Sequence, residues 1–113
     1  MATGCVFCKI AAGEIAATVV KRGDGMLAFG DLNPQAPTHL LVIPTYHVGT
    51  LNEVQDAGLL GRLLGFARDV AREAGIADRG YRVVLNTNPD GGQTVFHLHL
   101  HVLGGRPMTW PPG

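Results

Sequence analysis

The stretch His97-Leu98-His99-Leu100-His101-Val102-Leu103 alternates histidines with apolar residues and decides the fold. Side chains on a β-strand point to opposite faces in turn. A strand would therefore place the three histidines on one face and the apolar residues on the other, against the core. We predict that residues 94–103 form the last strand of a sheet. Three adjacent imidazoles crowd groups that titrate near neutrality, so the pattern favours a chemical use over a purely structural one.

Four further strands are expected, over residues 16–22, 26–31, 39–43 and 81–86. The first two flank Gly23-Asp24-Gly25, which is a hairpin turn signal. The third is a continuous apolar run that ends at Pro44, as is typical of a central strand buried on both faces. A turn is expected after the fourth, over Asn88–Gly92.

Two helices are expected, a short one over residues 5–12 and a long one over residues 54–74. Apolar residues recur along the long segment with the spacing of one helix face. The predicted buried face consists of Leu60, Leu63, Leu64, Ala67, Val70, Ala71 and Ala74. Gly75 follows as a plausible C-cap. Because the strands come mostly in hairpins, the sequence predicts an α+β fold with a five-stranded antiparallel sheet, one long helix and one short helix.

The bulk composition limits the classes of function. The 113 residues fit one domain, residues 1–113, and a chain of this size would gain from a dimer interface. Nine Lys and Arg balance nine Asp and Glu and are scattered, which argues against binding polymeric nucleic acid. No apolar run approaches the roughly 18 residues that cross a bilayer, and the first residues lack signal-peptide features. We therefore expect a cytoplasmic protein without membrane contact, in which Cys5-x-x-Cys8 indicates a metal or redox site.

Two chemical uses compete for the three histidines. They could hold a catalytic zinc ion as a His₃ site. Alternatively, one imidazole is a nucleophile that its neighbours orient and supply with protons. Gly91-Gly92-Gln93-Thr94 lies just upstream. Glycines let the backbone approach a ligand closely, and the next two side chains supply neutral donors, so this segment suits a phosphate and favours the nucleophile.

Three segments together resemble one family. GGQTVFHLHLHVL (residues 91–103), DLNPQAPTH (residues 31–39) and GGRPMTWPPG (residues 104–113) resemble the histidine triad (HIT) proteins and, within them, the histidine triad nucleotide-binding (Hint) branch. The resemblance runs from about Cys5 to the C-terminus. It implies a homodimer whose sheets join across the interface. It also implies hydrolysis of the P–N bond of adenosine or guanosine 5′-phosphoramidates to the nucleoside monophosphate, with no cofactor needed for the chemistry.

By motif position, the resemblance assigns the catalytic histidines. His99 matches the family nucleophile, which forms a nucleotidyl-histidine intermediate that water then cleaves. His101 would contact the phosphate and help to protonate the leaving amine. His97 completes the triad, and His39 matches a further histidine near the nucleophile.

The resemblance also assigns the nucleotide contacts. The side chains of Gln93 and Thr94, beside Gly92, would hold phosphate oxygens, with Asn86 next to them. Asp31 would accept the ribose hydroxyls. The expected slot around the base consists of Phe7, Ile10, Phe29, Leu32 and Leu41. Trp110 would reach the substrate end of the partner's site in the dimer.

A zinc site is implied by some bacterial HIT proteins that carry the same cysteine pair. There the pair resembles half of a site that two histidines complete, and by position these are His47 and His97, together with Cys5 and Cys8. Two thiolates and two imidazoles suit a closed, structural zinc site. The alternative is a pair of reduced thiols packed near the core.

Three other functions stay open. A zinc hydrolase would use His97, His99 and His101 as ligands, but carboxylates that could orient such ligands are scarce near the triad. A non-catalytic nucleotide sensor would not need the intact triad. A dinucleoside polyphosphate hydrolase of the same family would not be expected to end in the Hint-type C-terminus.

Overall fold

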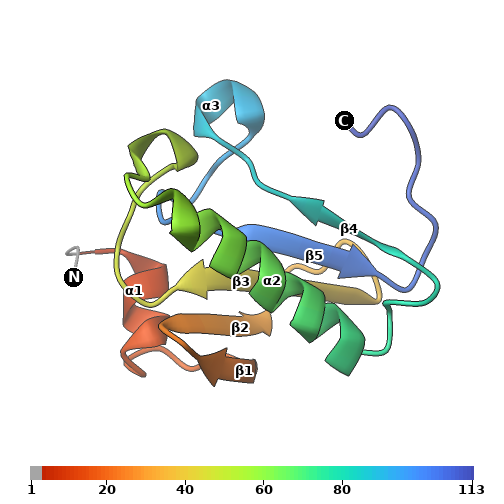
Figure 1. Cartoon of the computed structure of the whole chain (residues 1–113), viewed down its shortest axis with the longest axis horizontal. Helices are drawn as coiled ribbons and strands as arrows, with labels where there is room; N and C mark the ends of the chain where they lie inside the picture. Colours follow the sequence, from red (N-terminus) through yellow and green to blue (C-terminus); the bar gives the residue numbers. More distant parts are fainter. Residues whose placement is uncertain (1–3) are drawn as a thin grey trace.

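The structure is a computed structural model that describes residues 4–113. The elements in chain order are α1 (Val6–Ala11), β1 (Val19–Gly23), β2 (Met26–Gly30), β3 (Thr38–Pro44), a 3₁₀ turn (Leu51–Glu53), α2 (Ala57–Glu73), β4 (Tyr81–Val84), α3 (Asn88–Gly91) and β5 (Leu100–Gly104). The strands form one sheet in the order β1-β2-β3-β5-β4, and all neighbours are antiparallel. The predicted α+β fold is confirmed, with α2 lying across the sheet (Figure 1).

The two faces of the sheet carry separate cores. The α2 side buries the leucines and valine of the histidine stretch, Leu98, Leu100 and Val102, with alternate residues of β3. The opposite side packs Phe7 and Ile10 of α1 on the remaining strand residues. The predicted alternation is therefore confirmed: the apolar residues of the stretch face α2, and the histidines lie on the α1 side.

The first hairpin closes as the sequence predicts. Asp24 and Gly25 have φ values of 55° and 76°, and Gly23 pairs with Met26. Positive φ at both central residues is the geometry of a type I′ turn, whose twist matches that of the strands it joins. This hairpin places Phe29, at the end of β2, beside the site described below.

The long helix is confirmed, but its buried face differs from the prediction. Its buried residues are Leu59, Leu63, Phe66, Ala67, Val70 and Ala71. Leu64 is 56% exposed, because the stripe that contacts the sheet is rotated toward Leu59 and Phe66. The helix ends in a Schellman motif at Gly75, which has φ of 78° and donates to Arg72 O, while Ile76 N donates to Ala71 O.

The last strand is shorter than predicted. Strand β5 begins at Leu100, so His97 and His99 precede it in irregular backbone. The carbonyl of His97 turns to the imidazole of His99, and Leu98 N donates to the loop carbonyl of Val48 at 2.7 Å, instead of joining a ladder. The segment expected as a plain turn, Asn88–Gly91, forms the single helical turn α3.

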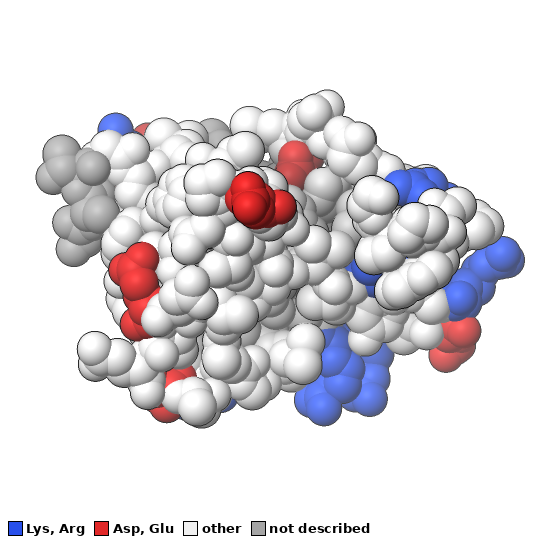
Figure 2. Space-filling view, turned by 90° about the horizontal axis from the view of Figure 1, so that it is seen from above, with Lys and Arg blue, Asp and Glu red and all other residues white. Residues whose placement is uncertain are grey.

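The surface carries no broad face of one charge in the view of Figure 2, where small basic and acidic groups interrupt a mostly neutral surface. None of the helices formed by residues 4–113 has the length and apolar character that a bilayer crossing requires.

The register of α2 gives a stability prediction. Leu63 is 1% exposed in the core under α2, so Leu63→Ala should lower the free energy of unfolding by about 2–5 kcal/mol. Leu64→Ala on the next position should change it by less than about 0.5 kcal/mol, because Leu64 faces solvent. Urea unfolding of both variants measures the difference, and similar losses would contradict the register.

Candidate functional site

Both ring nitrogens of His97 have partners within the protein. The side chain is fully buried. Its Nε2 lies 2.9 Å from the carbonyl of Pro44 and must donate to it, because a carbonyl can only accept. Its Nδ1 therefore carries a lone pair and faces the sulfurs of Cys5 and Cys8 at 3.3 and 3.5 Å. Both ring nitrogens of His97 therefore have partners within the protein, so a part of this residue in catalysis stays a prediction.

His99 receives its orientation from the backbone of His97. Its Nδ1 donates to the carbonyl of His97 at 2.7 Å, so Nε2 keeps its lone pair. The ring is 6% exposed and meets the ring of Phe7 edge-on, with 5.2 Å between centroids. A neutral imidazole whose proton is fixed on one nitrogen presents a nucleophile at the other.

His101 and His39 form a second imidazole pair beside Asp31. The two rings meet through Nδ1 of His101 and Nε2 of His39, 2.9 Å apart. The carboxylate of Asp31 lies 3.5 Å from the same nitrogen of His39. The structure thus brings together His99, His101 and His39, with 5.0 Å between the ring centroids of the first two.

Burial favours the neutral forms of His99 and His101. Desolvation, with the repulsion of His99 and His39, lowers the pKa of His101 to about 4. Desolvation also lowers the pKa of His99, although its bond to His97 O and the charge of Asp31 oppose the shift. At neutral pH a lone pair is therefore available on His99.

An apolar hollow of about 300 Å³ opens between α1 and the ends of β2 and β3. All five residues predicted for the base slot line it, together with Asp31 and Thr94: they are Phe7, Ile10, Phe29, Leu32 and Leu41. Leu32 is 94% exposed and forms the outer lip. The size and apolar walls suit a flat ring, and a carboxylate at the mouth suits the hydroxyls of a sugar.

Another hollow, of about 260 Å³, lies beside β4, β5 and the C-terminal segment. Asn86, predicted beside the phosphate, lines it with His101 and His39. Gly92 has φ of 83°, which explains the glycine at the end of α3. Trp110 is 83% exposed and lines neither hollow.

Gln93 has a different role from the predicted one. Its side-chain amide donates to the carbonyls of Gly49 and Val95 at 2.9 and 3.0 Å, and its oxygen accepts from Asn88 N. Both N–H groups are therefore used inside the protein. The prediction that this side chain holds a phosphate oxygen is wrong, and Gln93 instead ties the glycine turn to a neighbouring loop.

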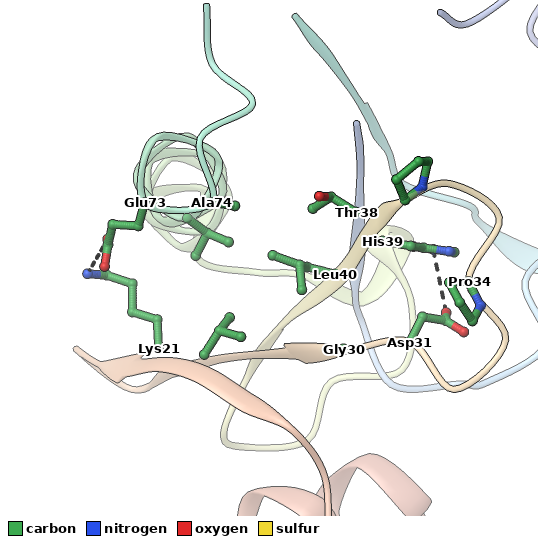
Figure 3. A pocket seen from close by; sticks show the side chains of 12 residues that line it. Lys21, Gly30, Asp31, Pro34, Thr38, His39, Leu40, Glu73 and Ala74 are labelled. Carbon is green, nitrogen blue, oxygen red and sulfur yellow. Dashed lines mark hydrogen bonds and ion pairs between the residues drawn. The ribbon is translucent and has the colours of Figure 1, made fainter. Parts of the chain in front are cut away.

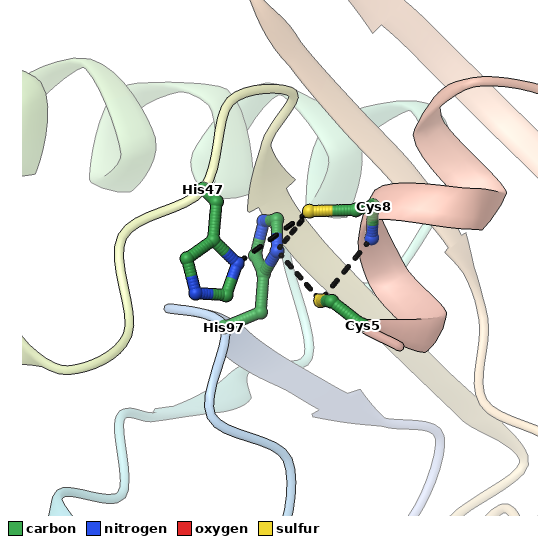
Figure 4. Close-up of side chains that lie close together, drawn as sticks. All are labelled: Cys5, Cys8, His47 and His97. Atoms are coloured by element: carbon green, nitrogen blue, oxygen red, sulfur yellow. Dashed lines mark hydrogen bonds between the residues drawn. The ribbon is translucent and has the colours of Figure 1, made fainter. Parts of the chain in front are cut away.

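The predicted metal ligands lie close together (Figure 4), with Cys8 and His97 buried and His47 exposed. Their donor atoms, from Cys5, Cys8, His47 and His97, all lie within 4.8 Å of one another. The thiol of Cys8 is 3.5 Å from Nδ1 of His47. Tetrahedral zinc with its usual bond lengths separates sulfur and nitrogen ligands by about 3.6 Å, so the set fits this ion.

The rival ligand set does not assemble. Among residues 4–113, the donor clusters that could hold a metal are the cysteine set and Asp31–His39–His101. His97, His99 and His101 do not share one, because the nitrogens of His97 turn to Pro44 and the thiols. The His₃ zinc hydrolase is therefore not supported.

Several contacts of the site could not be read from side-chain motifs. The carbonyl of Pro44 anchors His97, the carbonyl of Gly49 anchors Gln93, and the backbone N–H of Gln35 meets His39. These are main-chain groups, which every residue type supplies, so only the fold reveals them.

The amide of Gln93 gives a prediction. Gln93→Glu removes both donors and leaves the carbonyls of Gly49 and Val95 unpaired, so the free energy of unfolding should fall by about 1–3 kcal/mol. Gln55→Glu makes the same change at an exposed position and should be nearly neutral. Chemical denaturation compares them, and equal effects would contradict the role of Gln93.

The buried histidines predict loss of stability in acid. Their pKa values are lower in the folded chain than the ordinary 6.5, so the unfolded chain binds more protons between pH 6.5 and about 4. The stabilisation is complete above pH 6.5 and is lost as the pH falls toward 4. His101→Gln should show a weaker dependence in urea unfolding from pH 7.5 to 4.5. An identical pH profile would contradict the shift assigned to His101.

Comparison with known proteins bears on this site. Residues 12–108 match the HIT domain family. A purine nucleoside phosphoramidase of Escherichia coli (strain K12) is 46% identical over 110 residues, which cover 96% of this chain and 92% of that protein. A 14 kDa zinc-binding protein of Zea mays is 49% identical over 112 residues, with coverage of 96% and 87%.

The fold has close relatives among solved structures. A HIT family hydrolase from Legionella pneumophila aligns with a TM-score of 0.94 and 55% identity, covering 97% of this chain and 100% of that chain. Sequence and structure agree with the resemblance found in the histidine stretch. The chain therefore belongs to the HIT domain family.

Proposed function

We propose that the chain is a purine nucleoside phosphoramidase, which hydrolyses adenosine or guanosine 5′-phosphoramidates to the nucleoside monophosphate. The observation that carries the proposal is the free Nε2 of His99, whose partner nitrogen is fixed by the bond to His97 O. The ring of His99 contacts Phe7, which lines the apolar hollow with Asp31, and lies beside His101, which lines the hollow with Asn86. The relative of that name in Escherichia coli supports the choice of substrate.

The first step forms a bond between His99 Nε2 and phosphorus and breaks the bond between phosphorus and the amine. The electron pair of the broken bond goes to the amine nitrogen, which needs a proton because an amide anion is a poor leaving group. His101 supplies that proton. The negative phosphate, once bound, raises the pKa of His101 from its low value in the free protein.

The second step uses water. A water oxygen attacks phosphorus, its proton passes to the now neutral His101, and the P–N bond to His99 breaks. The nucleoside monophosphate leaves and both imidazoles regain their starting states. Thr94, at the mouth of the base hollow, supplies a hydroxyl donor for a phosphate oxygen, and Asp31 accepts the ribose hydroxyls.

The cysteine set takes structural zinc in this proposal. Cys5, Cys8, His47 and His97 would hold the ion, which supplies a cross-link between α1 and the segment before β5 and no reacting group. The name of the relative from Zea mays supports zinc. A homodimer is also proposed, because β4 is an open edge of the sheet and the exposed tail with Trp110 extends from the same side of the molecule (Figure 1).

Turnover tests the proposed reaction. Wild type should release a fluorescent amine from its adenosine 5′-phosphoramidate, with and without a strong chelator, and His99→Ala should lose at least about a thousandfold in kcat. Leu64→Ala is the surface control and should match wild type. Full loss on chelation with the fold retained would favour a metallohydrolase. Nucleotide binding without turnover in every sample would favour a sensor.

Metal content tests the structural zinc. The purified chain should hold one zinc per chain, and Cys8→Ser should lose it with a fall in melting temperature, because one of the four ligands is gone. His101→Gln should keep its zinc, since it lies outside the set. Elemental analysis and thermal unfolding provide the readouts, and a metal-free wild type of unchanged stability would contradict the assignment.

A further inference from the structure

A backbone amide contacts the histidine pair from the loop between β2 and β3. The N–H of Gln35 lies 3.0 Å from Nδ1 of His39. A backbone N–H can only donate, so this ring nitrogen must accept. The proton of neutral His39 is therefore on Nε2.

The position of the proton on His101 follows from that on His39. Nε2 of His39 is 2.9 Å from Nδ1 of His101. Because His39 donates here, Nδ1 of His101 accepts, and the proton of His101 is on Nε2. His101 also lines the hollow with Asn86.

We propose that the backbone N–H of Gln35 is a positioning group that fixes the tautomers of His39 and His101 in the free protein, so that His101 meets the substrate with Nε2–H as its donor. The second proton, which the bound phosphate favours on His101, then goes to Nδ1 and replaces the bond from His39 Nε2. The inference rests on the proposed function for its role, but the tautomers themselves belong to the free protein. Gln35 touches no substrate in this scheme and acts only through the two rings.

A divalent metal is the alternative use of this cluster. The donor atoms of Asp31, His39 and His101 all lie within 4.8 Å of one another. A metal would need the lone pair of His39 Nε2, which would move the proton to Nδ1, directly against the N–H of Gln35. The amide therefore favours the hydrogen-bonded pair. The carboxylate of Asp31, 3.5 Å from Nε2 (Figure 3), favours a proton there as well.

The loop holds this amide firmly in place. The backbone carbonyl of Gln35 accepts from Arg106 Nε at 3.0 Å, and Asn33 N donates to Asp31 at 2.8 Å. Pro34 and Pro37 have no N–H, so Gln35 and Ala36 are the only residues of 34–37 that can donate from the backbone.

A matched pair of substitutions separates the amide from the side chain. Gln35→Ala keeps the N–H, and Gln35→Pro removes it, because proline has no backbone N–H. Two-bond ¹H–¹⁵N spectra of the imidazoles report the tautomers at pH 7.5. Wild type and Gln35→Ala should both show Nε2–H forms for His39 and His101, with kcat within about twofold of each other.

In Gln35→Pro, His39 and His101 should no longer be held in their Nε2–H forms. The kcat should fall at least about tenfold with KM within about threefold, as expected when a general acid is misplaced. If this variant fails to fold, His39→Phe removes the donor to His101 while leaving the loop, and should give the same two changes in His101 and in kcat. Wild-type spectra and kcat in Gln35→Pro would overturn the proposal.

The failure of this inference and that of the proposed function look different. An Nδ1–H form of His101 in wild type, with turnover that still needs His99, overturns the positioning role and leaves the reaction intact. Absence of turnover in wild type, with both Nε2–H forms present, supports the tautomer chain and removes the phosphoramidase.

Discussion

The site depends on one residue, His97, which is tied at three points. Its Nε2 donates to Pro44 O, its Nδ1 faces the thiols, and its carbonyl accepts from His99. The contact with Pro44 fixes the ring and its proton on Nε2, so that Nδ1 keeps a lone pair that faces the two cysteines. The third contact fixes the proton of His99, which decides which of its nitrogens can attack. A metal on the cysteines would thus hold the same backbone segment that orients the nucleophile.

The alternating histidines of one stretch have different surroundings, although all three are the same residue type. His97 faces the sulfurs of Cys5 and Cys8, while His99 contacts Phe7 of the apolar hollow and His101 lines the hollow with Asn86. Only one residue separates each histidine from the next. The leucines between them bury into the α2 core, which prevents the imidazoles from turning to the other face. Burial also keeps the pKa of His101 low, so its charge depends on a bound anion.

The sequence predicts the periodic features and misses those made by the main chain. The five strands, both helices and the side of the sheet for each histidine follow from apolar spacing, as does the meeting of Cys5 and Cys8 on one helical turn. The predicted buried face of α2 is rotated from the observed one, because helix propensity does not decide whether Leu64 or Phe66 packs on the sheet. The roles of Gln93 and Gln35 depend on carbonyl and amide positions in three dimensions, which no residue pattern encodes.

The central claim is that His99 becomes covalently attached to the nucleotide, and the most direct test is to trap that adduct. Wild type would be mixed with an adenosine 5′-phosphoramidate, quenched within milliseconds in alkaline denaturant, digested, and analysed by mass spectrometry of the tryptic fragment of residues 83–113. We expect a mass increase of one nucleoside monophosphate located on His99, absent from His99→Ala. An adduct on His101 or His39, or turnover without any adduct, would contradict it.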